Sequence, residues 1–298
     1  MFKYVKQKDI NKSKWSDLVH RSSDSTIFCE YDYLNAFCEW DAIIYGDYEG
    51  AIALPYTSFL GIRSLYQPNF AQQCIWFGKK IGDSQVQEVF LLIRKMNHRI
   101  GFNSNLKLKG DSRKRVNQVL TLRNYETIRN NYSKSLKKNI IKNNPSLIIS
   151  RDTNPKRTIR LYQEAYGSKN TQIKPEHYSA FQVLINEKPD QFINVHAFNN
   201  KKLVASIVLA KSRNRLHYIL GAPTEKGRRL NALSVIIDHL IQQESGKEMI
   251  FDFEGSSIPS VYQYYASFGA VEEYFYTTEF CRWWLKPIDL VYKRLFKS

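Results

Sequence analysis

Apolar positions recur with two different periods in the second half of the chain, and each period predicts its own kind of element. Residues 192–198 and 202–211 alternate apolar and polar side chains, as strands do, around the turn-forming Asn199-Asn200-Lys201. They predict an antiparallel hairpin. Residues 230–241 instead carry leucine and isoleucine at helical spacing, and Gly246 is expected to end this helix.

The other elements of this half follow from the same two periods. We expect strands at 215–221, 249–253 and 271–280, and helices at 156–166, 175–187 and 259–268. A polar loop over 222–229 is expected to lead into the long helix. The predicted order is therefore three antiparallel strands, loop, long helix, strand, helix, strand.

The first half predicts helix, three strands, helix and then further strand. Helical spacing marks 27–40 and 86–98, a hairpin is expected over 41–54, and candidate strands lie at 106–108 and 118–122. A basic helix is expected over 129–144, where Pro145 disfavours its continuation. We place the domain limit after this helix, which gives a first domain at 1–145 and a second at 146–298.

Composition supports two folded cores. The chain has 298 residues, of which 43% are hydrophobic and 24% charged, which is typical of an ordered protein of two domains. The N-terminus has no apolar stretch of the signal-peptide kind, so a cytoplasmic location is expected. The four cysteines lie without CxxC spacing at Cys29, Cys38, Cys74 and Cys281, so we expect reduced structural thiols and no metal site.

A formal net charge of +16 predicts attraction to polyanions such as nucleic acid, anionic lipid or phosphorylated ligands. Residues 107–142 carry eleven Lys or Arg against two acids. Lys134, Lys137 and Lys138 of the basic helix are therefore candidates for contact with a substrate or its phosphates, and tRNA is a possible partner. The alternative is an ordinary solvated helix face.

The segment between the third strand and the long helix is a candidate phosphate site. Unpaired backbone N–H groups, the positive end of a helix dipole and three cations would meet there. The alternative is a basic loop with no ligand. The candidate donor-binding residues are Leu220, Gly221, Ala222, Lys226, Gly227, Arg228, Arg229 and Asn231, with the amides of the first three expected to hold a carbonyl oxygen or oxyanion.

Two acids and one tyrosine are candidate catalytic residues. Asp252 and Glu254 share one face at the end of a predicted strand, where a carboxylate would accept a proton from an attacking amine or orient it. Their alternative roles are a helix cap or a salt bridge. The phenol of Tyr265 is protonated at neutral pH and suits a general acid, although Tyr262, Tyr265 and Phe268 also form a stripe typical of a core.

Two stretches resemble the FemABX branch of the GNAT acyltransferase superfamily. Residues 132–142 resemble its Ser-Lys-x-x-Arg-Asn-Ile-x-x-Ala helix, and Asp252-Phe-Glu-Gly-Ser256 with residues 264–270 resembles its later strand and helix. The resemblance implies an α/β fold with mixed sheets in two tandem GNAT-like domains, the first degenerate. It also implies that Tyr265 protonates the leaving group, and that an amino acid passes from aminoacyl-tRNA to an amine of a peptidoglycan precursor.

Three departures from these patterns leave the identity of the acyl donor undecided. Gly227 lacks the second glycine of the usual acetyl-CoA loop, Tyr265 stands where some FemABX members have lysine, and no long helical arm is evident. We therefore expect an N-acyltransferase that uses acyl-CoA or aminoacyl-tRNA as co-substrate, with no tightly bound cofactor. The alternative is a non-catalytic protein that binds nucleic acid or a phosphate ligand on this scaffold.

The C-terminal segment 282–298 is aromatic, basic and partly amphipathic, which is compatible with peripheral contact to an anionic membrane. The alternative is a strand and helix that close the second core. The pattern predicts no oligomeric state.

Overall fold

The computed structural model describes residues 1–255 and 258–287 and divides into two compact units. Unit 1 consists of Met1–Arg115 and Tyr274–Ser298, and unit 2 of Val116–Glu273. The units thus divide elsewhere than at the expected limit, residue 145. The reason is that Leu136 and Ile140, on the predicted basic helix, are buried in the core of unit 2.

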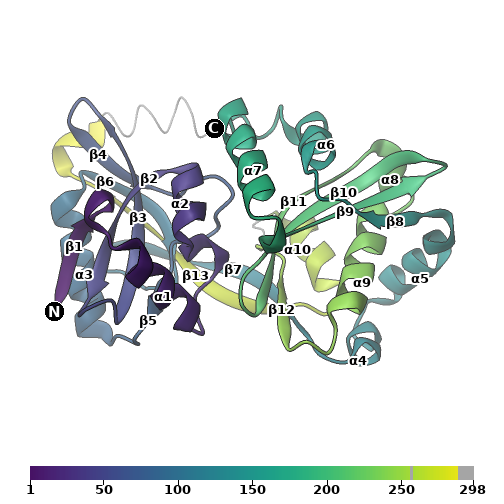
Figure 1. Ribbon diagram of the computed structural model, residues 1–298, viewed down its shortest axis with the longest axis horizontal. Helices are drawn as coiled ribbons and strands as arrows, with labels where there is room; N and C mark the ends of the chain where they lie inside the picture. The colour runs from purple at the N-terminus through teal and green to yellow at the C-terminus, as the bar shows by residue number, and fades with distance from the viewer. Residues whose placement is uncertain (256–257, 288–298) are drawn as a thin grey trace. The chain divides into compact units, whose positions relative to one another are not determined.

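Unit 1 is a mixed sheet with helices packed on it (Figure 1). Its strand order is β1-β2-β3-β4-β6-β13, with β5 beside β3, and only the β4–β6 pair is parallel among the pairs of this unit that the structure describes. The strands are β1 (Phe2–Lys6), β2 (Glu39–Tyr45), β3 (Gly50–Phe59), β4 (Ile62–Tyr66), β5 (Trp76–Gly78), β6 (Arg99–Ser104) and β13 (Val271–Cys281). The helices are α1 (Lys12–Arg21), α2 (Tyr31–Phe37) and α3 (Asp83–Met96), with 3₁₀ turns η1 (Gln7–Asp9), η2 (Ile27–Cys29) and η5 (Trp283–Leu285).

Unit 2 has the strand order β7-β12-β11-β10-β9-β8, in which only β11 and β12 run parallel among the described pairs. Its strands are β7 (Asp111–Leu122), β8 (Ile148–Arg151), β9 (Phe192–Asn199), β10 (Lys202–Lys211), β11 (Arg215–Pro223) and β12 (Met249–Asp252). Its helices are α4 (Tyr125–Asn130), α5 (Lys134–Asn143), α6 (Lys156–Tyr166), α7 (Pro175–Glu187), α8 (Glu225–Arg229), α9 (Ala232–Glu244) and α10 (Pro259–Ala266), with 3₁₀ turns η3 (Asn144–Ser146) and η4 (Pro189–Gln191).

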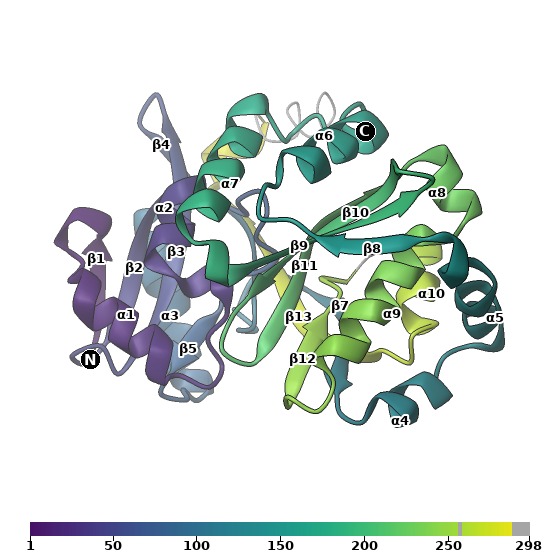
Figure 2. The ribbon, with the colours of Figure 1, turned by 45° about the vertical axis from the view of Figure 1, so that its right-hand side comes forward.

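Helices cover both faces of the unit 2 sheet. Helix α6 packs on β10 and β11 from one side, whereas α9 packs on β9, β10 and β11 from the other, and α5 lies beyond α9 (Figure 2). The apolar stripe of α9 supplies Val235, Ile236 and Leu240 to the main core, where they meet Ile207 and Phe251 of the sheet. Burial of this stripe explains why the long helix forms where its sequence period predicts it.

The last strand of each unit comes from a distant part of the chain. β7 begins in unit 1 and supplies Val119–Leu122 as the antiparallel partner of β12 in unit 2. β13 begins in unit 2 and supplies Tyr276–Cys281 as the antiparallel partner of β6 in unit 1. The sheet of unit 1 is therefore complete only when the chain has passed through unit 2 and returned.

Several expected elements differ from those observed. The expected helix over 27–40 is the turn η2, helix α2 and the start of β2, and the expected strand at 106–108 is not a strand, because the preceding residues form β6 instead. The basic helix expected over 129–144 is two helices, α4 and α5, separated at Asn131-Tyr132-Ser133. Among the described residues, no helix combines the length and apolar character needed to cross a bilayer.

Candidate functional site

The two parallel strands of unit 2 separate part of the way along β11. Their pairing runs through Arg215–Ile250 and Leu216–Phe251 and ends at His217–Asp252, although β11 continues to Pro223. The later part of β11 therefore has no strand partner on the β12 side among the described residues. Its backbone N–H and C=O groups on that side form an open edge inside the unit.

A β-bulge lies at the start of this open edge. On the β10 side, Tyr218 pairs with Leu209 and Leu220 pairs with Val208, so Ile219 is an extra residue. A bulge bends a strand and redirects the groups that follow it. The amides of Leu220 to Ala222, which the sequence suggested for a carbonyl or oxyanion, follow the bulge directly.

Asp252 is the centre of a buried polar network at the point of separation. Its Oδ2 accepts a charged hydrogen bond of 2.7 Å from Arg215 Nη1, and its Oδ1 accepts from Asn117 Nδ2 at 2.9 Å and from the Glu254 backbone N–H at 2.8 Å. Burial raises the pKa of Asp252, while Arg215 and these donors oppose that rise. Both oxygens of Asp252 are therefore hydrogen-bonded within the network.

Glu273, at the start of β13, completes the pairing of Arg215. The two groups form a bidentate pair, with Nη1–Oε2 at 2.8 Å and Nη2–Oε1 at 2.9 Å. The hydrogen bonds from Arg215 lower the pKa of Glu273 although the site is partly buried. Arg215 thus bridges two carboxylates and offsets part of their negative charge.

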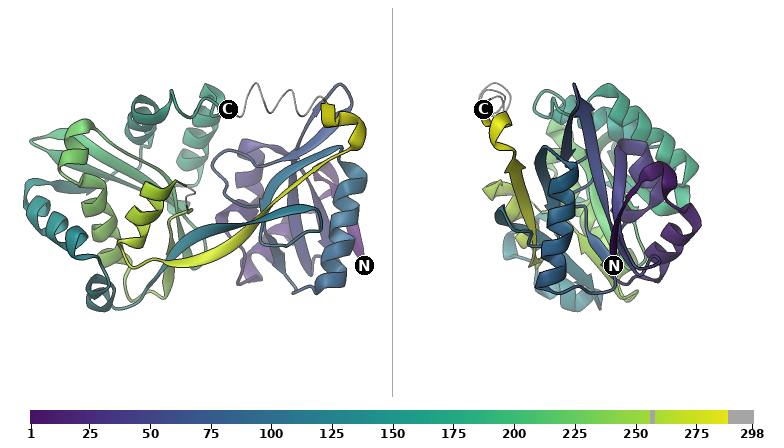
Figure 3. Two further views of the ribbon diagram at one scale, coloured as in Figure 1. Left: turned by 180° about the vertical axis from the view of Figure 1, so that it is seen from behind. Right: turned by 90° about the vertical axis from the view of Figure 1, so that its left-hand side faces the viewer.

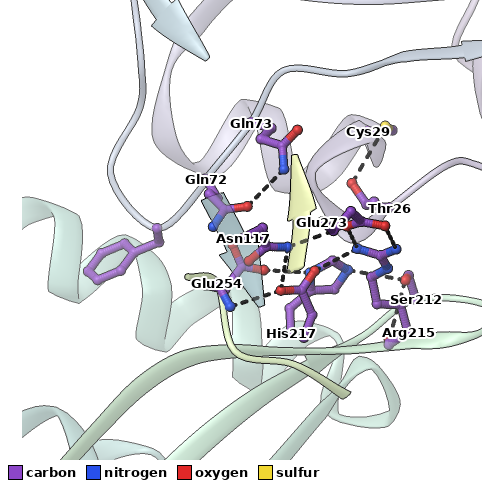
Figure 4. Close-up of polar contacts among 12 residues, drawn as sticks. Thr26, Cys29, Gln72, Gln73, Asn117, Ser212, Arg215, His217, Glu254 and Glu273 are labelled. Carbon is purple, nitrogen blue, oxygen red and sulfur yellow. Dashed lines mark hydrogen bonds and ion pairs between the residues drawn. The ribbon is translucent and has the colours of Figure 1, made fainter. Parts of the chain in front are cut away.

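Glu254 bonds to a buried histidine. Its Oε1 lies 2.6 Å from Nδ1 of His217, and Nε2 of the same ring lies 3.4 Å from the Ser212 hydroxyl (Figure 4). Burial and the nearby charge of Asp252 raise the pKa of Glu254 well above its usual range. Burial and the charge of Arg215 hold the pKa of His217 well below its usual range.

The raised pKa of Glu254 and the lowered pKa of His217 have the same consequence for the two groups. Both shifts favour the uncharged form of each group over an ion pair of carboxylate and imidazolium. Glu254 also has a backbone φ of 59°, and Gly255 has 52°, so the chain turns sharply as soon as β12 ends. An acid whose pKa is moved toward neutrality at such a strand end is suited to proton transfer.

The same three side chains are spaced as metal ligands would be. One ligand atom from each of His217, Asp252 and Glu254 lies within 4.8 Å of the other two. However, the guanidinium of Arg215 already lies 2.7 Å from Asp252 Oδ2, and Nδ1 of His217 is bonded to Glu254. The geometry fits Arg215 as the resident cation, and a metal would have to displace it.

Tyr265 lies beside this network on helix α10. Its ring stacks on Phe253, which follows β12, with centroids 4.7 Å apart, and meets the ring of Tyr218 edge-on at 6.3 Å. The structure gives its hydroxyl no hydrogen-bond partner among the described residues. Burial raises the pKa of Tyr265, so the phenol stays protonated. The neighbouring Tyr264 differs, since its hydroxyl bonds to Ser234 at 3.1 Å.

The candidate donor segment is a short helix rather than the expected loop. Thr224 caps α8 by accepting from the Gly227 N–H at 3.0 Å, and a Cβ on Gly227 would lie 2.0 Å from the carbonyl oxygen of Val204. Gly227 is therefore required for close packing on β10, and its N–H is already used. Arg229 is paired with Glu225 at 2.7 Å on the exposed surface.

The remaining donor candidates flank the start of α9. Lys226 and Arg228 are exposed, and Asn231 adopts φ 49° at the N-cap of α9 without a side-chain cap. The start of α9 therefore keeps backbone N–H groups that its own cap residue does not satisfy. Anion binding at this segment stays a prediction, and two of the predicted groups, Gly227 and Arg229, have other partners.

The three candidate lysines of the basic helix lie on α5, which packs against α9 through its apolar side. Lys134 and Lys138 are exposed, and Lys137 donates to the Asn130 carbonyl at 2.9 Å. Their neighbours are helices of the outer layer and not β11 or β12. Contact with a substrate through these lysines stays a prediction.

A cavity of about 180 Å³ lies at another edge of unit 2, lined by Arg151, Asp152, Ile185, Phe192 and Asn194 among others. Small-molecule sites usually enclose roughly 300–1,000 Å³. This cavity is smaller, and it borders β8 and β9 rather than the separated strands. We do not assign the acyl donor to it.

Four residues of the network were not among the sequence candidates: Arg215, His217, Asn117 and Glu273. The alternation Arg215-Leu216-His217 places both polar side chains on one face of β11, as Asp252 and Glu254 are on β12. That pattern was available in the sequence. Which strands would pair was not, because Asn117 and Glu273 come from segments far along the chain.

No protein-family model and no curated protein sequence matches the chain. Solved structures do match its fold over nearly the whole length. FemX matches 97% of this chain and 99% of its own with a TM-score of 0.65 at 8% identity. The C-terminal domain of a putative lysylphosphatidylglycerol synthetase from Agrobacterium fabrum matches 95% of both chains with a TM-score of 0.56 at 9% identity.

A tandem GNAT protein from the clavulanic acid biosynthesis pathway matches 94% of this chain and 98% of its own, with a TM-score of 0.50 at 11% identity. At such low identity these likenesses establish the fold alone. The expected α/β fold is confirmed: the chain has the FemABX-like and tandem GNAT fold.

Proposed function

We propose that the protein is an N-acyltransferase whose reaction takes place where β11 and β12 separate. The observation that carries this proposal is the open, bulged edge of β11 beside a carboxyl whose pKa is moved toward neutrality. Backbone amides there are held in place before any ligand arrives, which is how an oxyanion is stabilised most effectively. The fold shared with acyltransferases is compatible with this chemistry.

In the proposed reaction, Glu254 and Tyr265 transfer protons and the other residues of the network position them. The nitrogen of an amine acceptor attacks the acyl carbon and forms the new C–N bond, while the bond from that carbon to the donor oxygen or sulfur breaks. The carboxylate form of Glu254 takes the proton from the amine, and the hydroxyl of Tyr265 gives its proton to the leaving oxygen or sulfur. Asp252, Arg215 and His217 fix the position and protonation of Glu254.

The donor in this proposal is an acyl-CoA or an aminoacyl-tRNA, and the acceptor is an amine such as that of a cell-wall precursor. Both donors carry phosphates as well as an activated acyl group. Lys226, Arg228 and the first N–H groups of α9 would bind those phosphates. Since esters and thioesters are already activated, positioning would supply most of the rate.

Thermal unfolding in the presence of acetyl-CoA, bulk aminoacyl-tRNA or uncharged tRNA tests the donor. A ligand that binds only the folded protein at about 100 times its Kd stabilises it by about 2.7 kcal/mol. We expect one acyl donor to raise the Tm, and the Lys226→Ala/Arg228→Ala variant to lose most of that rise. The Lys134→Ala/Lys138→Ala variant tests the α5 surface separately.

The non-catalytic alternative makes a different prediction. If uncharged tRNA stabilised the protein as strongly as aminoacyl-tRNA, and no amine acceptor consumed either acyl donor, the protein would be a binding module on an acyltransferase fold. Acyl transfer to any primary amine with release of CoA or free tRNA would exclude that alternative.

A further inference from the structure

The hairpin between β3 and β4 ends in exposed apolar side chains. Phe59 is 73% exposed and Leu60 is 85% exposed at the tip, where Phe59 pairs with Ile62 across the turn. Leu60 and Gly61 have φ values of 46° and 77°. Such turns favour Asn-Gly, so a leucine at the first position is conformationally costly and places an apolar group in water.

A second exposed apolar group lies in the same unit, after β13. Trp283 is 80% exposed and Trp284 is 44% exposed within the turn η5. Tryptophan is rarely left this exposed on a protein surface without a partner, because its ring is large and mostly apolar. Its indole N–H makes it suited to the boundary between water and lipid.

The two groups occupy the same end of unit 1. The ring of Trp284 contacts that of His98 at 5.7 Å, and His98 in turn accepts through Nδ1 from the backbone N–H of Arg63 on β4. The β3–β4 hairpin and η5 therefore lie at one end of the sheet, as both views of Figure 3 show. An approaching flat surface would meet both.

The surroundings of these side chains are positively charged. The segments 57–63, 94–99 and 282–287 contain four arginines and two lysines, and no Asp or Glu. Lys95 and Lys286 are exposed, and Arg282 donates to the Arg94 carbonyl at 3.2 Å, which joins η5 to the end of α3. Arg63 is different, since it is paired with the buried Asp41 at 2.6 Å.

We propose that this end of unit 1, formed by Phe59, Leu60, Trp283 and Trp284 with Lys95, Lys286 and Arg94 around them, docks on an anionic membrane surface. Apolar and aromatic tips amid cations satisfy both requirements of peripheral membrane binding, insertion of apolar groups at the interface and attraction to anionic headgroups. The expected contact through 282–298 is thus extended to the β3–β4 hairpin, while residues 288–298 lie outside the described part of the chain. The inference does not depend on the proposed acyl transfer.

Co-sedimentation of the full chain with phosphatidylcholine vesicles, with and without phosphatidylglycerol, tests the proposal. We expect binding only when phosphatidylglycerol is present, and weaker binding as salt is raised. The variant Phe59→Ser/Leu60→Asn/Trp283→Ser should bind at least about tenfold more weakly. Asn suits the positive φ of residue 60, so this change should not disturb the turn.

A matched control is Ile141→Ser, because Ile141 is 60% exposed on the basic helix α5. It should bind like the unchanged protein. Equal binding of the triple variant, equal binding to vesicles without phosphatidylglycerol, or a dimer in solution that the triple variant converts to monomer would each overturn the proposal. The last result would assign the surface to a second copy of the chain.

Discussion

At the scale of single residues, Glu254 and Asp252 have similar surroundings but different hydrogen-bond partners. Both oxygens of Asp252 are bonded to Arg215, Asn117 or the backbone. Glu254 instead lies 2.6 Å from His217 Nδ1, and burial raises its pKa. The sequence placed both acids on one face but could not separate these roles, because the partners come from β7 and β11.

Replacing Glu254 by Gln should lower turnover by about 10²–10⁴-fold, the usual contribution of a general base. Because only the carboxylate accepts the proton, turnover of the unchanged protein should rise as pH passes upward through the Glu254 pKa, above the usual Glu value of about 4.3. Steady-state rates across a pH series would measure this.

The matched change is Glu272→Gln, since Glu272 is exposed and bonded to Tyr262. That variant should keep its activity. Full activity in Glu254→Gln would remove Glu254 from the mechanism.

The Tyr265→Phe variant should lose about 10²-fold in turnover, the low end for a general acid, because thioester and ester leaving groups already depart readily. Its folding should be unaffected, since the hydroxyl has no protein partner among the described residues. Tyr264→Phe is the control: it should lose about 1 kcal/mol of stability with its bond to Ser234, and little turnover. Turnover that is equal in both variants would contradict the general-acid role.

The buried His196 is expected to make the stability of the fold depend on pH. It is buried with Nδ1 2.8 Å from the Ser206 hydroxyl and Nε2 3.4 Å from Asp152 Oδ2, and burial lowers its pKa. Below about pH 6.5 the unfolded chain therefore binds a proton that the folded protein does not bind. The contribution of His196 to the free energy of unfolding is present above that pH and is lost as pH falls.

We expect the His196→Gln variant to show a shallower fall in unfolding free energy between about pH 6.5 and pH 5 than the unchanged protein, by at most about 1.4 kcal/mol per pH unit. Urea unfolding at several pH values measures it. Parallel pH profiles for the two proteins would show that His196 titrates alike in the folded and unfolded states.

At the scale of elements, strong periodicity was the reliable signal. Helices α6 and α7 lie at the predicted residues because each carries a clear apolar face, and α7 also starts with Pro175. Short elements such as β1 and β8 were missed, since four or five residues contain too little pattern. Helix α8 was read as a loop because its Lys-Gly-Arg-Arg composition resembles one.

Among the contacts between elements, the packing of α8 on β10 leaves no room for a side chain at Gly227. The Gly227→Ala change should destabilise the protein by about 1–3 kcal/mol, because the added Cβ would meet the Val204 carbonyl at 2.0 Å. Gly101→Ala on β6 is the control, as a Cβ there meets no atom within 4 Å. Chemical denaturation should separate the two, and equal midpoints would mean that α8 moves aside without cost.

At the scale of the whole molecule, the sequence predicted the class of fold but not the path of the chain. The resemblance of 132–142 and 252–270 to FemABX motifs led to two tandem GNAT-like units, and the fold comparison agrees. The limit at 145 came from a proline and a basic helix. In the structure α4 and α5 instead pack in unit 2. The limit of a unit depends on contacts between residues far apart in the chain, and local composition does not reveal these contacts.

Removing residues 274–298 tests the exchange of strands. The truncated chain should lose the partner of β6, so unit 1 should melt at lower temperature and aggregate through the exposed strand edge. Removing only 288–298 leaves β13 in place and is the control. Calorimetry and size-exclusion chromatography would distinguish the two chains, and equal melting of both would show that β13 contributes little to unit 1.

The same exchange sets an order of events during synthesis. Ser104 of β6 leaves the ribosome long before its partner Tyr276, and all of unit 2 is made between them. At about 5–20 residues per second, the N-terminal unit waits roughly 10–30 s with one strand missing. Until β13 has been made, the nascent chain has an open sheet edge at β6, and such edges favour aggregation.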